Sequence, residues 1–233
     1  MSNFSLAEGS VRDLNANLHA GANNLADTQW LITEPDGRHA LACGLHQRLD
    51  VVINGNAGYY CAGKNQHAHV TINGTVGVGV AENMMSGCVR VQGNASQSAG
   101  ATGHGGLLII EGDASARCGI SMKGIDIVVG GSVGHMSAFM GQAGRLVVCG
   151  DAGESLGDSL YEARLYVRGD VKSLGSDCIE KPMRDEHRAE LKELLDQAGF
   201  EVEPDEFKRY GSARRLYNMH VDNARLDGGG GDE

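Results

Sequence analysis

The chain has 233 residues, an ordinary hydrophobic fraction of 41% and a formal net charge of −10. The acidic balance is spread along the chain and disfavours nucleic acid as a partner, because phosphate binding needs a basic stripe. No apolar run approaches the length of a membrane span, and residues 1–8 lack the pattern of a secretory signal, so we expect a cytoplasmic protein without membrane contact.

Glycine is over-represented, with 35 residues, whereas aromatic residues make up 5% and there are only 3 prolines. A typical protein contains about 7% glycine. This composition indicates a backbone that turns often and packs closely, and it favours a repeat fold. Residues 1–50 precede any clear repeat, and we expect them to form an N-terminal segment that caps the fold, because a solenoid needs its ends covered.

Residues 51–183 carry the main signal, a repeat of 19 residues. Seven strand-like segments begin at Val51, Val70, Val89, Leu108, Ile127, Leu146 and Leu165. Within each segment, β-branched or other apolar residues alternate, which predicts strands with one face inward. A fixed period without insertions predicts one coil of a solenoid per repeat. The predicted fold is therefore all-β, a parallel β-helix built as a single-stranded solenoid of seven 19-residue coils, with short C-terminal helices.

Each repeat contains a predicted corner. A glycine recurs there at Gly55, Gly74, Gly93, Gly112, Gly131, Gly150 and Gly169. A short polar residue follows each glycine, and we expect the glycine to adopt an unusual backbone angle while the polar side chain bonds the local backbone. A second column is small, with Ala62, Ala81, Gly100, Gly119, Ala138, Gly157 and Ser176, which predicts a narrow interior.

Residues 184–226 are predicted to form a helical extension, and residues 227–233 a disordered tail. Helical spacing of apolar residues over 183–198, ended by Gly199, predicts a first helix, and 205–220 a second. We expect the helices to cover the end of the last coil rather than to bind a partner. The second segment also carries possible partner contacts of types common at interfaces, namely Phe207, Tyr210, Arg214, Arg215 and Tyr217.

Residues that could perform chemistry are sparse. The six cysteines have no C-x-x-C pair, which favours reduced thiols packed as small apolar residues. His67 and His69 alternate before a strand without a third ligand, so we interpret them as solvated surface. The glycine-rich stretches lack the following helix that phosphate or dinucleotide binding requires. We therefore predict no catalytic, cofactor-binding or metal-binding residue in this chain.

Three glycine-rich motifs carry a family resemblance: NGNAGYYCAGK (54–64), NGTVGVGVAENMMSG (73–87) and GGSVGHMSAFMGQAG (130–144). They resemble the GXGXG domain of the glutamate synthase family over about residues 40–178. The segment KRYGSARRLYNMHVDNA (208–224) and the chain length resemble the stand-alone β-helix subunit of N-methylglutamate synthase, also called methylamine–glutamate N-methyltransferase.

This resemblance implies a right-handed β-helix without catalytic residues that acts as the structural subunit of a hetero-oligomer. Its implied partners are a glutamine-amidotransferase-like subunit and an FMN-binding glutamate-synthase-like subunit, so FMN is expected in a partner. The implied reaction converts glutamate and methylamine to N-methylglutamate and ammonia. The alternatives are a scaffold subunit of a true glutamate synthase or of formylmethanofuran dehydrogenase, whose own GXGXG subunit is similar, a self-sufficient β-helix enzyme, or a free-standing binding module.

Overall fold

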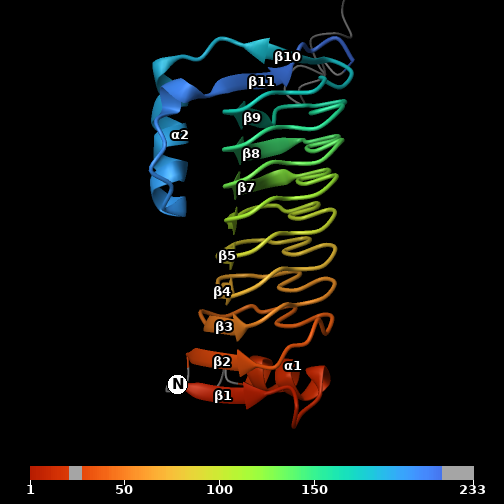
Figure 1. Ribbon diagram of the computed structural model, residues 1–233, viewed down its shortest axis with the longest axis vertical. Coiled ribbons are helices and arrows are strands. Elements are labelled where there is room, and N and C mark those ends of the chain that lie inside the picture. Colours follow the sequence, from red (N-terminus) through yellow and green to blue (C-terminus); the bar gives the residue numbers. More distant parts are fainter. Residues whose placement is uncertain (21–27, 217–233) are drawn as a thin grey trace, which may run out of the picture.

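The computed structural model describes residues 1–20 and 28–216, and it shows a tall column of stacked coils (Figure 1). Eleven strands form one sheet in the order β1-β2-β3-β4-β5-β6-β7-β8-β9-β11-β10. The strands are β1 (Ser2–Ser5), β2 (Gln29–Thr33), β3 (Asp50–Asn54), β4 (His69–Ile72), β5 (Cys88–Val91), β6 (Leu107–Ile110), β7 (Lys123–Val129), β8 (Ala143–Val148), β9 (Arg164–Val167), β10 (Cys178–Lys181) and β11 (Lys208–Ser212). The helices are α1 (Val11–Ala20), α2 (Asp185–Ala198) and the short 3-10 helix η2 (Pro204–Glu206).

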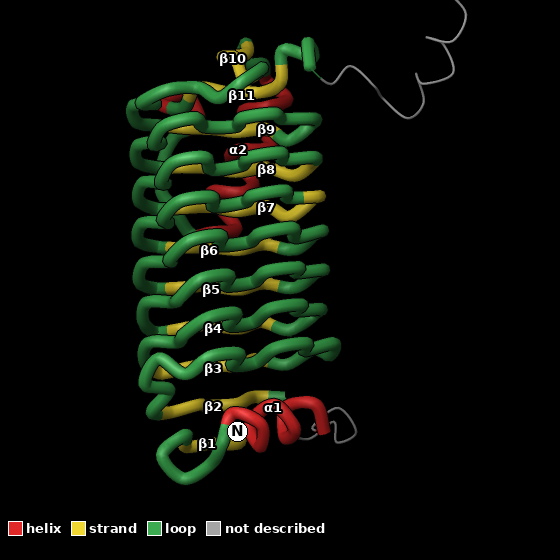
Figure 2. Tube along the Cα trace, turned by 90° about the vertical axis from the view of Figure 1, so that its right-hand side faces the viewer, coloured by secondary structure: helices red, strands yellow, loops and turns green. Residues whose placement is uncertain are grey.

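The strands β3 to β9 are parallel and stacked in the register that the 19-residue repeat predicts. Val51 pairs with Val70, which pairs with Val89, and the same spacing continues to Leu165 in β9. Figure 2 shows the coils, each returning through loops to the next strand. The predicted parallel β-helix is thus confirmed, with its inward valines, leucines and isoleucines forming one continuous buried core.

The corner glycines are explained by close approach of neighbouring coils. Among them only Gly55 has a positive φ, of 127°. A Cβ on Gly74 would lie 2.6 Å from the carbonyl of Gly55, and one on Gly112 would lie 2.1 Å from Oδ1 of Asn94. The expectation of an unusual backbone angle is therefore wrong for the other corners, where a side chain would collide with the previous coil.

From Asn56 to Asp151, the polar residue after each corner glycine bonds the next coil rather than its local backbone. The amide of Thr75 donates to Oδ1 of Asn56 at 2.8 Å, and that of Asp113 donates to Oδ1 of Asn94 at 2.8 Å. The same contact continues from coil to coil up to the amide of Asp170. Each side chain thus satisfies one backbone donor at the outer corner, which ties successive coils together.

The predicted small column lies where the backbone is left-handed. Ala62, Ala81, Gly100, Gly119, Ala138 and Gly157 all have φ between 53° and 68°. Small size matters as well, because a Cβ on Gly100 would lie 2.6 Å from Cδ1 of Ile127. The last member is misassigned by strict 19-residue counting: the final coil is one residue shorter, since Leu156 bridges Leu174, and Gly175 therefore replaces Ser176 in the column.

The N-terminal segment contains a helix, α1, that lies at one end of the column. The strand β2 joins the solenoid with Trp30 paired to Val51, and β1 is parallel to β2 at the edge. The helix α1 buries Leu14 and Leu18 in the main core (Figure 1). It begins at a Ser10–Asp13 pair, in which the amide of Asp13 donates to the Ser10 hydroxyl at 3.2 Å.

The opposite end is closed by a strand where a helix was expected. Residues 208–212 form β11, which is antiparallel to β9 on one side and to β10 on the other. The expected helix over 205–220 is thus wrong for its described part, because only Pro204–Glu206 is helical, as a 3-10 turn. The reversed direction of β11 ends the parallel stacking. The tail 227–233 lies outside the described residues.

The first C-terminal helix is confirmed as α2, but it does not cover the end of the coils. It runs along the outside of the sheet beside β7, β8 and β9 (Figure 1). Its Leu191, Leu194 and Leu195 pack on the outward side chains of the strands, and this second core also contains Ile109, Val128, Val147, Tyr166 and Phe207. Neither α1 nor α2 is long and apolar enough to cross a membrane.

Candidate functional site

The strongest candidate site is a pocket of about 330 Å³ at the C-terminal cap. It lies where the last coil, β10, β11 and the first turn of α2 meet. Its lining consists of Tyr161, Glu162, Ala163, Arg164, Lys181, Arg184, His187, Arg209, Gly211, Ser212 and Arg214. Five of these residues are basic and one is acidic, in a chain whose acidic residues outnumber its basic ones by 30 to 20. We call this the basic pocket.

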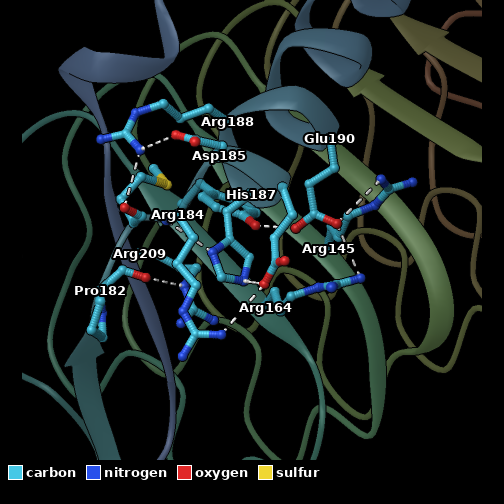
Figure 3. A network of polar contacts seen from close by, with 12 residues as sticks. Arg145, Arg164, Pro182, Arg184, Asp185, His187, Arg188, Glu190 and Arg209 are labelled. Carbon is cyan, nitrogen blue, oxygen red and sulfur yellow. Dashed lines mark hydrogen bonds and ion pairs between the residues drawn. The ribbon is translucent and has the colours of Figure 1, made fainter.

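Arg164 of the pocket lining is held from behind by a half-buried carboxylate outside the lining, Glu190 of α2 (Figure 3). Its Oε2 lies 3.2 Å from NH2 of Arg164 and 3.9 Å from NH1 of Arg145. Its Oε1 accepts a hydrogen bond from the Tyr166 hydroxyl. Burial, reinforced by Glu190, raises the pKa of Tyr166, so the phenol keeps its proton and donates it. These contacts hold α2 against the strands and fix Arg164 at the rim.

Other basic side chains of the pocket are only weakly neutralised within the chain. Among the described residues, Arg209 makes no ion pair, and its Nε donates to the carbonyl of Pro182 at 3.1 Å (Figure 3). Burial lowers the pKa of Arg209, and the nearby charges of Arg184 and Arg164 add to this effect. Arg184 reaches only Glu186, at 3.6 Å, and Lys181 has no ion pair in the part of the chain that the structure describes.

His187 forms the floor between these cations and is buried. Its Nδ1 accepts a hydrogen bond from the backbone amide of Arg184 at 3.1 Å, which fixes the start of α2. Burial lowers the pKa of His187, and the charge of Arg209 lowers it further. The imidazole is therefore neutral near pH 7, and it is engaged in holding the helix start.

The partner contacts predicted from sequence separate into buried and exposed residues. Phe207 and Tyr210 are each 5% exposed and pack inside the chain, Phe207 against α2 and Tyr210 in the main core, so they are not available to a partner in this structure. Arg214 and Arg215 are exposed, and Arg214 pairs with Glu162 at 2.9 Å. Tyr217 lies outside the described residues.

A second pocket, of about 520 Å³, lies near the first coils and contains both histidines of the predicted surface pair. His69 Nδ1 is 3.6 Å from Oδ1 of Asp50, and the Ser86 hydroxyl lies 3.2 Å from Nδ1 of His67. Within residues 1–20 and 28–216, no cluster of three or more histidine, cysteine or acidic side chains could hold a metal ion. The two exposed histidines of this pocket contact different residues, Asp50 and Ser86, and do not converge on one position.

The cysteines provide no nucleophile. All six are free, and burial raises the pKa of Cys43 and Cys149 to about 11 and that of Cys118 and Cys178 to about 12. Burial also raises the pKa of the fully buried Cys61. Thiols with such values stay protonated near neutral pH, and a protonated thiol is a poor nucleophile.

Sequence reasoning missed the basic pocket, because its cations come from separate segments that only the fold brings together.

One curated relative is strongly similar along nearly the whole chain. Protein GlxC of Rhizobium meliloti (strain 1021) is 59% identical over 220 residues, which cover 94% of this chain and 96% of GlxC. No protein-family model matches the chain. No solved structure matches it either.

Proposed function

The chain belongs to the family of protein GlxC, and from this premise we propose that it is a structural subunit of a glutamate-synthase-like complex. In this proposal it bridges a glutamine-amidotransferase-like subunit and an FMN-binding synthase subunit. The complex is an N-methylglutamate synthase, which forms N-methylglutamate and ammonia from glutamate and methylamine. The chain itself supplies shape and contact surfaces rather than catalytic groups.

The observation that carries the proposal is the combination of a regular solenoid with the absence of converging catalytic groups. In the described residues the thiols are protonated, His187 serves the start of α2, and the side chains gather no metal-binding cluster. Catalysis requires a nucleophile, a base or a metal arranged around one position. The parallel β-helix is also the fold that the motifs at 54–64, 73–87 and 130–144 imply through their resemblance.

Co-purification tests this proposal. We expect the tagged chain, isolated from the cells that naturally make it, to bring down two stoichiometric partners, with visible flavin absorption that follows one of them. Intact-mass analysis would identify the partners, and those of a true glutamate synthase or of formylmethanofuran dehydrogenase would select the corresponding alternative. Turnover or stoichiometric flavin in the chain purified alone would contradict the structural role.

A further inference from the structure

Resting on the proposed structural role, we propose that the basic pocket is a docking site for an acidic segment of a partner subunit. The segment would present two or more carboxylates, from aspartate or glutamate side chains or from a C-terminus. The first support is an excess of positive charge at one place. Arg164, Lys181, Arg184, Arg209 and Arg214 line one pocket together with a single acidic residue, Glu162.

The second support is that the chain leaves part of this charge uncompensated. Arg209 is partly buried, and its guanidinium has the carbonyl of Pro182 as its acceptor, with no carboxylate paired to it in the described chain. Lys181 has no ion pair there either, and Arg184 has only the 3.6 Å contact with Glu186. Like charges held together repel one another, so a bound anion would relieve a repulsion that the fold imposes.

The third support is that the pocket is held rigid by neighbouring contacts. Glu190 holds Arg164 at 3.2 Å and accepts from Tyr166, and β11 fixes Arg209 opposite Tyr166 in the sheet. Guanidinium groups in fixed positions bind carboxylates through paired hydrogen bonds and lose little freedom when they do so. The pocket therefore has both the charge and the fixed geometry for this ligand.

The size and surroundings of the pocket favour a short protein segment over a long polyanion. A volume of about 330 Å³ accommodates only a few side chains. Outside the pocket the protein carries a net negative charge, since the whole chain is at −10, and this charge repels an extended nucleic acid. A small basic pocket on an otherwise acidic protein favours a ligand whose negative charge is confined to a short segment.

Peptide binding to the full-length chain tests the docking site directly. We expect a fluorescent hexaglutamate peptide to bind, as measured by anisotropy, and a hexaglutamine peptide not to bind. The double variant Lys181→Glu with Arg184→Glu should weaken hexaglutamate binding at least tenfold. The matched control, Arg12→Glu with Lys64→Glu, changes the charge equally at exposed positions away from the pocket and should keep most of the binding.

Equal binding by both double variants, or no binding by the unaltered chain, would overturn the docking site. So would displacement of the peptide by inorganic phosphate at an ionic strength where chloride has no effect, because the pocket would then be a phosphate site. Co-purification separates this inference from the proposed function. If the unaltered chain captures no partners, the proposed function fails; if it captures two and the Lys181→Glu, Arg184→Glu variant captures them equally well, only the docking site fails.

Discussion

Replacing a corner glycine by alanine tests whether close packing between coils determines these positions. Gly112 has no positive φ, so alanine meets no backbone strain there. Its Cβ would lie 2.1 Å from Oδ1 of Asn94 and 2.9 Å from the Gly93 carbonyl oxygen. The side chain of Asn94 cannot move away freely, because it accepts the amide hydrogen bond of Asp113 at 2.8 Å.

The expected cost follows from these two contacts. Overpacking a tightly packed site costs about 1–3 kcal/mol. Losing the hydrogen bond from Asp113 adds about 1 kcal/mol. Gly112→Ala should therefore lower the free energy of unfolding by about 2–4 kcal/mol, which for a chain of this size lowers the melting temperature by about 4–16 °C. Urea and thermal denaturation followed by circular dichroism would measure both quantities.

The matched control is Gly211→Ala in β11. Its φ is not positive, and its Cβ would meet nothing closer than Cγ of Lys181 at 3.7 Å. The free energy of unfolding of this variant should lie within about 1 kcal/mol of that of the unaltered protein, because an alanine that fits without strain mainly restricts the unfolded chain. Equal stability of Gly112→Ala and Gly211→Ala would refute the close-packing explanation of the corner column.

Three further outcomes are expected. Gly119→Leu should destabilise the coil by about 1–3 kcal/mol or more in urea denaturation, because φ is 68° and Cδ1 of Ile127 would lie 3.3 Å from the new Cβ; an unchanged midpoint would contradict the assigned column. His187 has a lowered pKa, so the unfolded chain binds more protons between that value and 6.5; stability should rise with pH across this window, and a His187→Asn variant that keeps the same slope would contradict the assignment. Arg214→Glu with Arg215→Glu should weaken partner capture with little change in melting temperature, since both side chains are exposed; normal capture would remove these arginines from the interface.

The register of the strands β3 to β9 could be predicted from the sequence because the coils between them all have the same length. Val51 and Val70 are 19 positions apart and lie side by side, so spacing along the chain translates directly into contact. The reason for the corner glycines could not be read in the same way. The atom that excludes a side chain at Gly112 belongs to Asn94, and that clash depends on the distance between coils rather than on local preference.

The start of α1 and the packing of α2 on the sheet both have signals in the sequence. Ser10 and Asp13 form the pattern that starts α1. The outward residues Ile109, Val128 and Val147 are apolar, which is typical of strands covered on both faces, and α2 provides that cover. In contrast, the basic pocket could not be foreseen, because it needs the antiparallel pairing of β11 between β9 and β10.

The placement of β11 also determines when the fold can be completed during synthesis. The edge of β9 is covered by Lys208–Ser212, which leave the ribosome about 40 residues after Val167, the partner of Lys208. At about 5–20 residues per second, this interval lasts about 2–8 s. The strand β10 is made early in this interval, but it has no neighbour in the sheet until β11 is made. The nascent coils therefore present an open parallel edge to solvent until Lys208–Ser212 have emerged.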